Sequence, residues 1–125
     1  MPDLTRQDVI KILAISDHAR LSGIDLSGLA LNGLNFAGAD LIRANLSDTN
    51  LSNAYMRGAH IEDANLERVI LVNANLKEAS LKGSSLKGAD LSDAKDGTRG
   101  KIQYPVLYGH RRPRAQSRHS AVSGP

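Results

Sequence analysis

The chain has 125 residues, of which 41% are hydrophobic and 3% aromatic, and it contains no cysteine. The absence of cysteine excludes a disulfide framework, a thiolate metal site and a cysteine nucleophile, and the low aromatic content predicts an aliphatic core. The net charge of +3 is unevenly distributed, because residues 1–94 carry −3 and residues 95–125 carry +6. This asymmetry predicts a folded body followed by a basic arm.

The sequence contains no predicted membrane segment. No apolar run reaches the length of about 20 residues that a membrane-spanning helix needs. The short apolar stretch Val9–Ile15 is interrupted by Lys11 and preceded by Asp3 and Asp8, which does not fit a signal peptide. We therefore expect a cytoplasmic protein with no membrane insertion.

A short amphipathic helix is predicted at the N-terminus, over about Arg6–Ser16. Thr5 and Asp8 have the spacing of a capping box, and Leu4 and Val9 are placed for a hydrophobic staple. The repeats that follow this helix, described next, predict a solenoid, which is a stack of coils. An open end of a solenoid exposes both its core and its strand edge, so solenoids need covered ends. We expect this helix to cover the first coil of such a solenoid; a helix that lies on a membrane surface is the alternative.

An apolar residue then recurs at every fifth position. A period of five fits neither the 3.6-residue turn of a helix nor the two-residue alternation of a strand. The chain must therefore turn once per repeat, and each turn must return the apolar residue to the interior. Glycine often follows two positions later, at one fixed corner. We call the apolar residue that recurs at every fifth position the central residue of its repeat. The fifteen central residues are Leu21, Leu26, Leu31, Phe36, Leu41, Leu46, Leu51, Met56, Ile61, Leu66, Leu71, Leu76, Leu81, Leu86 and Leu91.

The residue two positions before each central residue is mostly small and most often alanine, although Ile24, Leu29 and Leu34 are larger, and Asn or Asp usually lies between the two positions. This pattern resembles the pentapeptide-repeat family, Ala-Asp/Asn-Leu-X-X, over about residues 19–95. The resemblance implies an all-β solenoid, namely a right-handed quadrilateral β-helix of about four coils. The direct matches are Ala39-Asp40-Leu41, Ala44-Asn45-Leu46, Ala64-Asn65-Leu66, Ala74-Asn75-Leu76 and Ala89-Asp90-Leu91.

With four repeats per coil, residues twenty positions apart stack on one another. Phe36 and Met56, the two unusual central residues, then share one column. We interpret this column as core packing rather than a cofactor site, because a ring and a flexible thioether fill space together. The predicted core includes Leu26, Phe36, Leu46, Met56, Leu66, Leu76 and Leu86.

The C-terminal part is predicted to be irregular and basic. The apolar segment Ile102–Tyr108 is expected either to cover the last coil or to dock on another chain. Residues 109–125 have too little apolar content to fold alone and are expected to be intrinsically flexible. The predicted units are a capping helix (1–18), the β-helix (19–95), a C-terminal cap or docking segment (96–108) and a basic tail (109–125).

The sequence offers no catalytic set of nucleophile, base and pocket. His60 lies at an outward repeat position and is interpreted as a solvated histidine. The other histidines have no partner at metal-ligand spacing. We therefore expect a protein that is not an enzyme and that has no metal or cofactor site.

Ile70 and Val72 place apolar side chains at outward positions that the repeat usually gives to polar residues. They indicate either tolerated exposure, cover by the C-terminal segment, or an anchor for a partner. Tyr55 and Arg57, on the adjacent side, are of types enriched at interfaces. The candidate partner-binding residues are Tyr55, Arg57, Ile70, Val72, Tyr104, Tyr108, Arg111, Arg112 and Arg114.

The sequence therefore predicts a non-catalytic protein–protein interaction module or scaffold, for example a small subunit or assembly factor of a larger complex. Self-association through the C-terminal coil is a further expectation. The resemblance implies a second hypothesis, because some pentapeptide-repeat proteins mimic DNA and bind DNA gyrase; that mimicry needs a long acidic face. A third hypothesis is weak nucleic-acid contact through the arginines of the tail.

Overall fold

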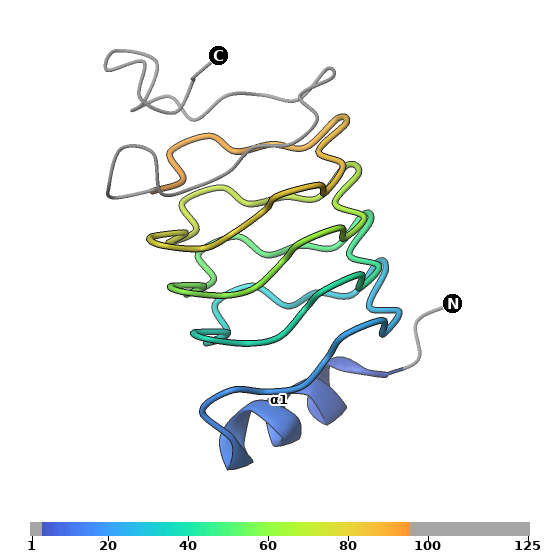
Figure 1. Cartoon of the computed structure of the whole chain (residues 1–125), viewed down its shortest axis with the longest axis vertical. Coiled ribbons are helices and arrows are strands. Elements are labelled where there is room, and N and C mark those ends of the chain that lie inside the picture. Colours follow the sequence, from blue (N-terminus) through green and yellow to red (C-terminus); the bar gives the residue numbers. More distant parts are fainter. Residues whose placement is uncertain (1–3, 96–125) are drawn as a thin grey trace.

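The computed structural model describes residues 4–95 of the chain. Within this range the helix α1 spans Arg6–Ile15, and the chain after it forms a stack of coils (Figure 1). The coils are joined by parallel bridges of single residues rather than by continuous strands. The predictions for residues 96–108 and 109–125 fall outside the described residues.

Each coil has four sides and returns to its starting side after twenty residues. Parallel bridges join Arg20 to Asp40, Asp40 to His60 and His60 to Ser80, and the other three sides repeat this spacing. The coils comprise residues 21–40, 41–60, 61–80 and 81–95. Each side is named here by its first central residue: the Leu21 side, the Leu26 side, the Leu31 side and the Phe36 side.

Each corner is a tight turn that follows a central residue. The amide of Ala39, for example, donates to the carbonyl of Phe36 at 3.0 Å. The residue two positions after every central residue has a positive φ, between 56° and 77°. A positive φ at the third residue is what a type II turn requires. The repeat therefore turns at the same point every time.

The interior is a narrow aliphatic core. All fifteen central residues are buried, with at most 1% of their surface exposed. Alanine at most of the inner positions leaves room for the central side chains to meet in close packing. The residues predicted as core are all among these buried residues: Leu26, Phe36, Leu46, Met56, Leu66, Leu76 and Leu86.

The Asn and Asp residues before the central positions stabilise the corners. The side-chain oxygen of Asn50 accepts from the amide of Ser52 at 3.0 Å, and Asp90 accepts from Ser92 at 3.0 Å. This arrangement is an Asx turn, in which the side chain bonds its own backbone two residues on. The preference of the repeat for Asn or Asp therefore has a local structural cause.

The helix α1 lies against the first coil (Figure 1). Its capping box is formed, because Thr5 Oγ1 accepts from the Asp8 amide at 3.2 Å and Asp8 Oδ2 accepts from the Thr5 amide at 3.0 Å. Val9 is fully buried. The helix ends one residue earlier than expected, because Ser16 is extended, with φ of −147°. Partly buried residues that pack against the core include Leu4, Ile12, Leu13, Ile24, Leu29 and Leu34.

Arg6 covers part of the open edge of the first coil. In the second coil, the carbonyls of Asn50 and Ser52 accept hydrogen bonds from the coil below. The equivalent carbonyls of the first coil are those of Ala30 and Asn32. Arg6 Nη1 donates to Ala30 O at 2.7 Å and to Asn32 O at 3.4 Å. The helix therefore supplies donors that a preceding coil would otherwise supply.

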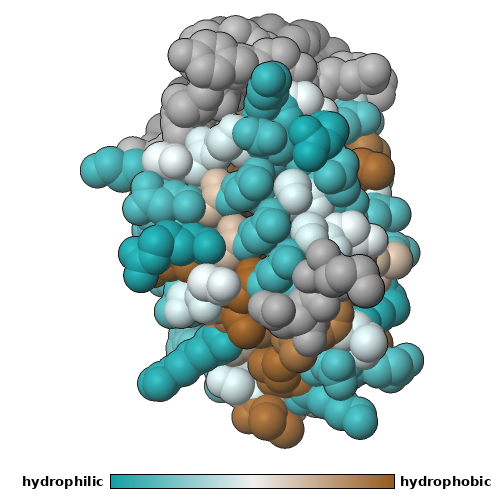
Figure 2. Space-filling model, turned by 90° about the vertical axis from the view of Figure 1, so that its right-hand side faces the viewer, coloured by the Kyte–Doolittle hydropathy of each residue, from teal (hydrophilic) through white to brown (hydrophobic). Residues whose placement is uncertain are grey.

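On the face shown in Figure 2, hydrophobic residues gather at the end of the molecule where α1 lies. Hydrophilic residues cover most of the coils above them. Ile15, the last residue of α1, is 83% exposed. The large exposed hydrophobic residues of the described coils are different ones, Tyr55 and Ile70.

Candidate protein-interaction surface

Ile70 and Val72 flank the buried residue Leu71 on the Leu31 side of the third coil. The Ile70 amide donates to Thr49 O at 3.0 Å, and its carbonyl accepts from the Leu51 amide at 2.7 Å. The Ile70 backbone is thus held by the second coil, while the residue as a whole is 38% exposed. Val72 is half-buried. The structure brings these two predicted residues together on one side.

Tyr55 and Arg57 flank the buried residue Met56 on the Phe36 side of the second coil. The Tyr55 amide donates to Leu34 O at 2.9 Å, and Tyr55 itself is 40% exposed. Arg57 is also exposed, and its Nη2 lies 3.7 Å from Glu78 Oε1. These two predicted residues therefore lie around one corner from Ile70 and Val72.

Tyr55 and Ile70 occupy positions where the neighbouring coils carry corner-stabilising amides or carboxylates. On the Phe36 side, Asn35 and Asn75 accept from amides two residues on, at 2.9 and 3.0 Å. On the Leu31 side, Asn50 and Asp90 do the same. An isoleucine side chain has no oxygen for this bond, and the phenol of tyrosine lies too far from its backbone. At both positions the repeat lacks a stabilising contact and exposes a large apolar group.

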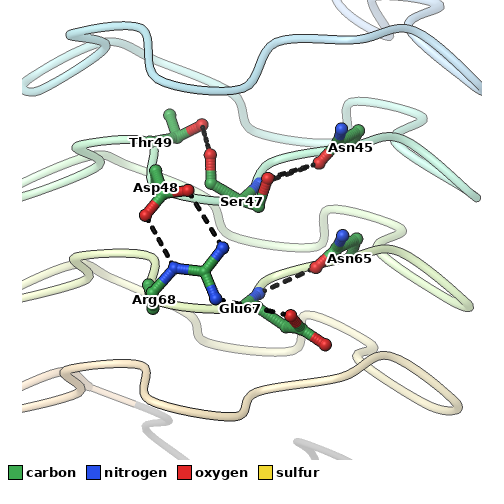
Figure 3. A network of polar contacts seen from close by, with 7 residues as sticks. All are labelled: Asn45, Ser47, Asp48, Thr49, Asn65, Glu67 and Arg68. Atoms are coloured by element: carbon green, nitrogen blue, oxygen red, sulfur yellow. Dashed lines mark hydrogen bonds and ion pairs between the residues drawn. The ribbon is translucent and has the colours of Figure 1, made fainter.

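A two-bond ion pair between Asp48 and Arg68, here called the clasp, lies at the corner that precedes Ile70 (Figure 3). Arg68 donates from Nε to Asp48 Oδ1 at 2.8 Å and from Nη2 to Oδ2 at 3.1 Å, which joins the second and third coils. The hydrogen bonds from Arg68 lower the pKa of Asp48. Arg68 Nη1 also lies 3.5 Å from Glu67 Oε1. Ile70 follows Arg68 by two positions, so this exposed ion pair joins the two coils close to Ile70.

The remaining predicted site residues lie outside the described residues: Tyr104, Tyr108, Arg111, Arg112 and Arg114. The role of Arg6 was not predicted from the sequence, although an arginine directly after the capping Thr5 was a visible signal. Lys95 was also not predicted as a site residue. It lies in the same column as Tyr55 and Asn75. The twenty-residue spacing is sufficient to find that column.

A shallow depression that opens to solvent lies on the Leu21 side. Its polar groups serve the local structure, because His18 Nδ1 lies 3.3 Å from Gly38 O and Asp40 accepts from the Ile42 amide at 3.1 Å. No nucleophile and base pair up among its residues. It is lined by His18, Arg20, Gly38, Asp40, Ile42 and His60.

Residues 4–95 contain no group of three or more His, Cys, Asp or Glu side chains placed to hold a metal ion. No helix in this range combines the length and the apolar character needed to cross a bilayer.

A family model described as "Pentapeptide repeats (8 copies)" matches the chain twice, at residues 19–58 and at residues 59–95. Among solved structures, the chain is similar to Rfr23, a pentapeptide repeat protein of the cyanobacterium Cyanothece 51142, at 34% identity and a TM-score of 0.62. That match covers 75% of this chain and 56% of Rfr23. A search of curated proteins found no match.

A second similar structure is HetL from the cyanobacterium Nostoc sp. strain PCC 7120, described as involved in the regulation of heterocyst differentiation. It is 39% identical, with a TM-score of 0.53, over 62% of this chain and 39% of HetL. QnrB1, a plasmid-mediated fluoroquinolone resistance protein, is 19% identical with a TM-score of 0.50, over 78% of this chain and 59% of QnrB1. At this identity the likeness to QnrB1 concerns the fold alone. The chain thus spans slightly more than half of the length of Rfr23 and less than half of the length of HetL.

Proposed function

Because this chain belongs to the pentapeptide-repeat family, whose members fold as right-handed quadrilateral β-helices, we propose that it is a non-catalytic module that binds another protein. Proteins of this family are generally structural or interaction proteins rather than enzymes. The binding surface is formed by the outward side chains of the Leu31 and Phe36 sides. Ile70, Val72 and Tyr55 supply its apolar part.

One observation carries this proposal. Ile70 and Tyr55 each replace an Asx residue that would stabilise the corner, and each exposes a large apolar side chain instead. Natural chains accept a local loss of stability most readily where the residue serves another purpose. Exposed apolar groups with a polar surround are typical of protein–protein contact sites. Two such replacements on adjacent sides and in successive coils form one surface.

A role as a DNA-mimicking modulator of gyrase receives less support. Such mimicry needs a continuous acidic face, whereas the described coils mix both signs of charge. Arg68 pairs with Asp48 and Arg57 lies near Glu78. The resistance activity in the name of QnrB1 belongs to that protein.

The test is affinity capture with the full chain as bait at physiological salt. Three baits are compared: the wild type, Ile70→Asn, and Lys82→Asn as a matched control on the opposite, Leu21 side. We expect a defined protein partner that the wild type and the control retain and that Ile70→Asn loses. A second copy of this chain is one of the partners that the capture detects.

The melting temperature of Ile70→Asn shows whether a lost partner reflects a lost contact or a lost fold. Ile70→Asn restores an Asx residue, so its melting temperature should equal or exceed that of the wild type. Loss of the partner then reflects a lost contact and not a lost fold. If all three baits retain the same proteins, or if none retains a partner, the proposed function is wrong.

A further inference from the structure

The outward positions of the Phe36 side include three cations. Arg57, Lys77 and Lys95 lie on this side, and none of its outward residues within 4–95 is acidic. Glu78, at the corner that follows, lies 3.7 Å from Arg57. Within the same range, neither Lys77 nor Lys95 takes part in an ion pair. This side therefore presents more positive than negative charge.

Two of these cations stack directly on one another. The amides of Gly38 and Gly58 donate to the carbonyls of Arg57 and Lys77, each at 2.9 Å, so Arg57 and Lys77 hold the same place in successive coils. Neighbouring strands lie about 4.8 Å apart, and like charges directly opposite each other destabilise a sheet. An arrangement that is unfavourable for folding favours a role in recognition.

The apolar residues lie just around the corner from these cations. Asn73 has a φ of 63° and turns the chain from Val72 onto the Phe36 side, where Lys77 follows. Ile70 and Val72 therefore adjoin the cationic side in the same coil. We call the combined set the corner surface; it comprises Tyr55, Arg57, Ile70, Val72, Lys77 and Lys95.

We propose that the corner surface binds an acidic protein segment that also carries a large apolar side chain. This inference rests on the proposed function and adds the chemistry of the partner. Carboxylates of the segment pair with the cations of the Phe36 side, while its apolar side chain packs on Ile70 and Val72. Apolar anchors dominate affinity at such sites, whereas charges at the rim speed association and make it depend on salt.

A nucleic acid fits the corner surface less well. A phosphate backbone pairs with cations but makes no use of exposed Ile70 and Val72. Asp90 lies directly above Ile70, since a parallel bridge joins the two residues. Its carboxylate repels phosphate and the carboxylates of an acidic peptide alike, so it does not distinguish the two ligands. The exposed apolar residues Ile70 and Val72 therefore favour a protein segment.

Short random peptides displayed on phage supply a probe that assumes no particular partner. The peptides are selected on the full chain and then depleted on the Ile70→Asn variant. Depletion removes peptides that bind elsewhere, including those that bind residues 96–125, which are intact in both proteins. A parallel depletion on Val72→Ser serves the same purpose if Ile70→Asn does not fold.

The recovered peptides are then measured against the full chain, Lys77→Glu and Lys82→Glu. Lys82 is an exposed lysine of the Leu21 side, so Lys82→Glu makes the same charge change away from the corner surface. We expect peptides enriched in Asp, Glu and large apolar residues. Lys77→Glu should weaken their binding on the order of tenfold and Lys82→Glu by less than about twofold, and added salt should weaken it further.

Each contrary outcome has a distinct meaning. Peptides that depend on Ile70 but lack acidic residues, or that ignore Lys77→Glu, would overturn this inference and leave the proposed function intact. A selection without any Ile70-dependent peptide would overturn both. A labelled single-stranded oligonucleotide that competes with the peptides and loses binding in Lys77→Glu would reassign the corner surface to nucleic acid.

Discussion

The corner residue of each repeat adopts the left-handed backbone region, whether or not it is glycine. Gly33 and Gly38 both have a positive φ, of 76° and 69°. A Cβ at Gly33 would meet no atom within 4 Å, whereas a Cβ at Gly38 would lie 2.8 Å from His18 Nδ1. An alanine at position 33 would therefore add backbone strain alone, whereas an alanine at position 38 would add both backbone strain and a steric clash.

We predict that Gly33→Ala lowers the free energy of unfolding by about 1 kcal/mol, because a left-handed conformation is costly for alanine. Gly38→Ala should lower it further, since the alanine also displaces the His18 ring. In a His18→Ala background this extra cost should shrink, which a double-mutant cycle in urea measures. Equal costs for both single variants would show that the His18 contact does not form.

Hydrogen bonds to two aspartates make the stability of the folded chain depend on pH in the acid range. The Ser27 side chain and backbone lower the pKa of Asp25, and Arg68 lowers the pKa of Asp48. A lowered folded pKa stabilises the folded chain above the ordinary aspartate value of about 3.9. That stabilisation is lost as the pH falls through the lowered folded values.

We therefore predict a melting temperature that changes little between about pH 5 and 7 and falls below about pH 4. A variant with Asp25→Asn and Asp48→Asn keeps an oxygen acceptor at both positions but removes both titrations. Its melting temperature should fall less on acidification than that of the wild type. Identical pH profiles for the two proteins would contradict the assignment of these carboxylates.

At the scale of elements, α1 and the first coil depend on each other. The guanidinium of Arg6 contacts the carbonyls of Ala30 and Asn32, and Val9 is fully buried beside the core. A carbonyl at an open edge that loses its donor must find water instead. The side chain of Arg6 thus stabilises the end of the β-helix as well as the helix.

We predict that Arg6→Ala lowers the free energy of unfolding by about 1–2 kcal/mol, as expected for a charged hydrogen bond to the backbone. Arg6→Lys should lower it by less, because a lysine can still donate to one of the two carbonyls. Thermal melts monitored by circular dichroism measure both effects. Arg6→Met keeps the helix propensity similar and removes every donor, so it should lower the free energy of unfolding as Arg6→Ala does. No change in any variant would mean that the contact contributes nothing.

The coils could be predicted because each repeat carries its own turn and its own inward residue within five positions, and many repeats add an Asx acceptor. The stacking of Phe36 and Met56 followed from the five-residue spacing together with the four repeats per coil that the family resemblance implies. The contact between Arg6 and Ala30 spans 24 positions and belongs to no period. It depends on how α1 packs on the first coil, which repeat arithmetic does not specify.

The candidate surface could be predicted only in part for a similar reason. The five-residue register is sufficient to place Tyr55 and Ile70 at outward positions. That each of them replaces a stabilising Asx turn follows instead from the hydrogen bonds of Asn50 and Asn75. The stacking of Arg57 under Lys77 likewise depends on the pairing of the coils.

At the scale of the whole molecule, the four sides are rigidly linked but chemically different. The clasp of Asp48 and Arg68 lies at the corner where the Leu31 side begins. Apolar Ile70 lies on the Leu31 side, and cationic residues occupy the Phe36 side. Since neighbouring coils are hydrogen-bonded along their length, the surface is preorganised, which reduces the entropic cost of binding. A partner should therefore bind without rearranging the β-helix.

Photo-crosslinking from single positions of the full chain in cells tests the central claim most directly. A benzophenone side chain is placed at position 70 in one variant and, as a control, at position 82 on the opposite side in another. The account predicts a discrete adduct with another protein from position 70 and none from position 82. No adduct from position 70, or the same adducts from both positions, would contradict it.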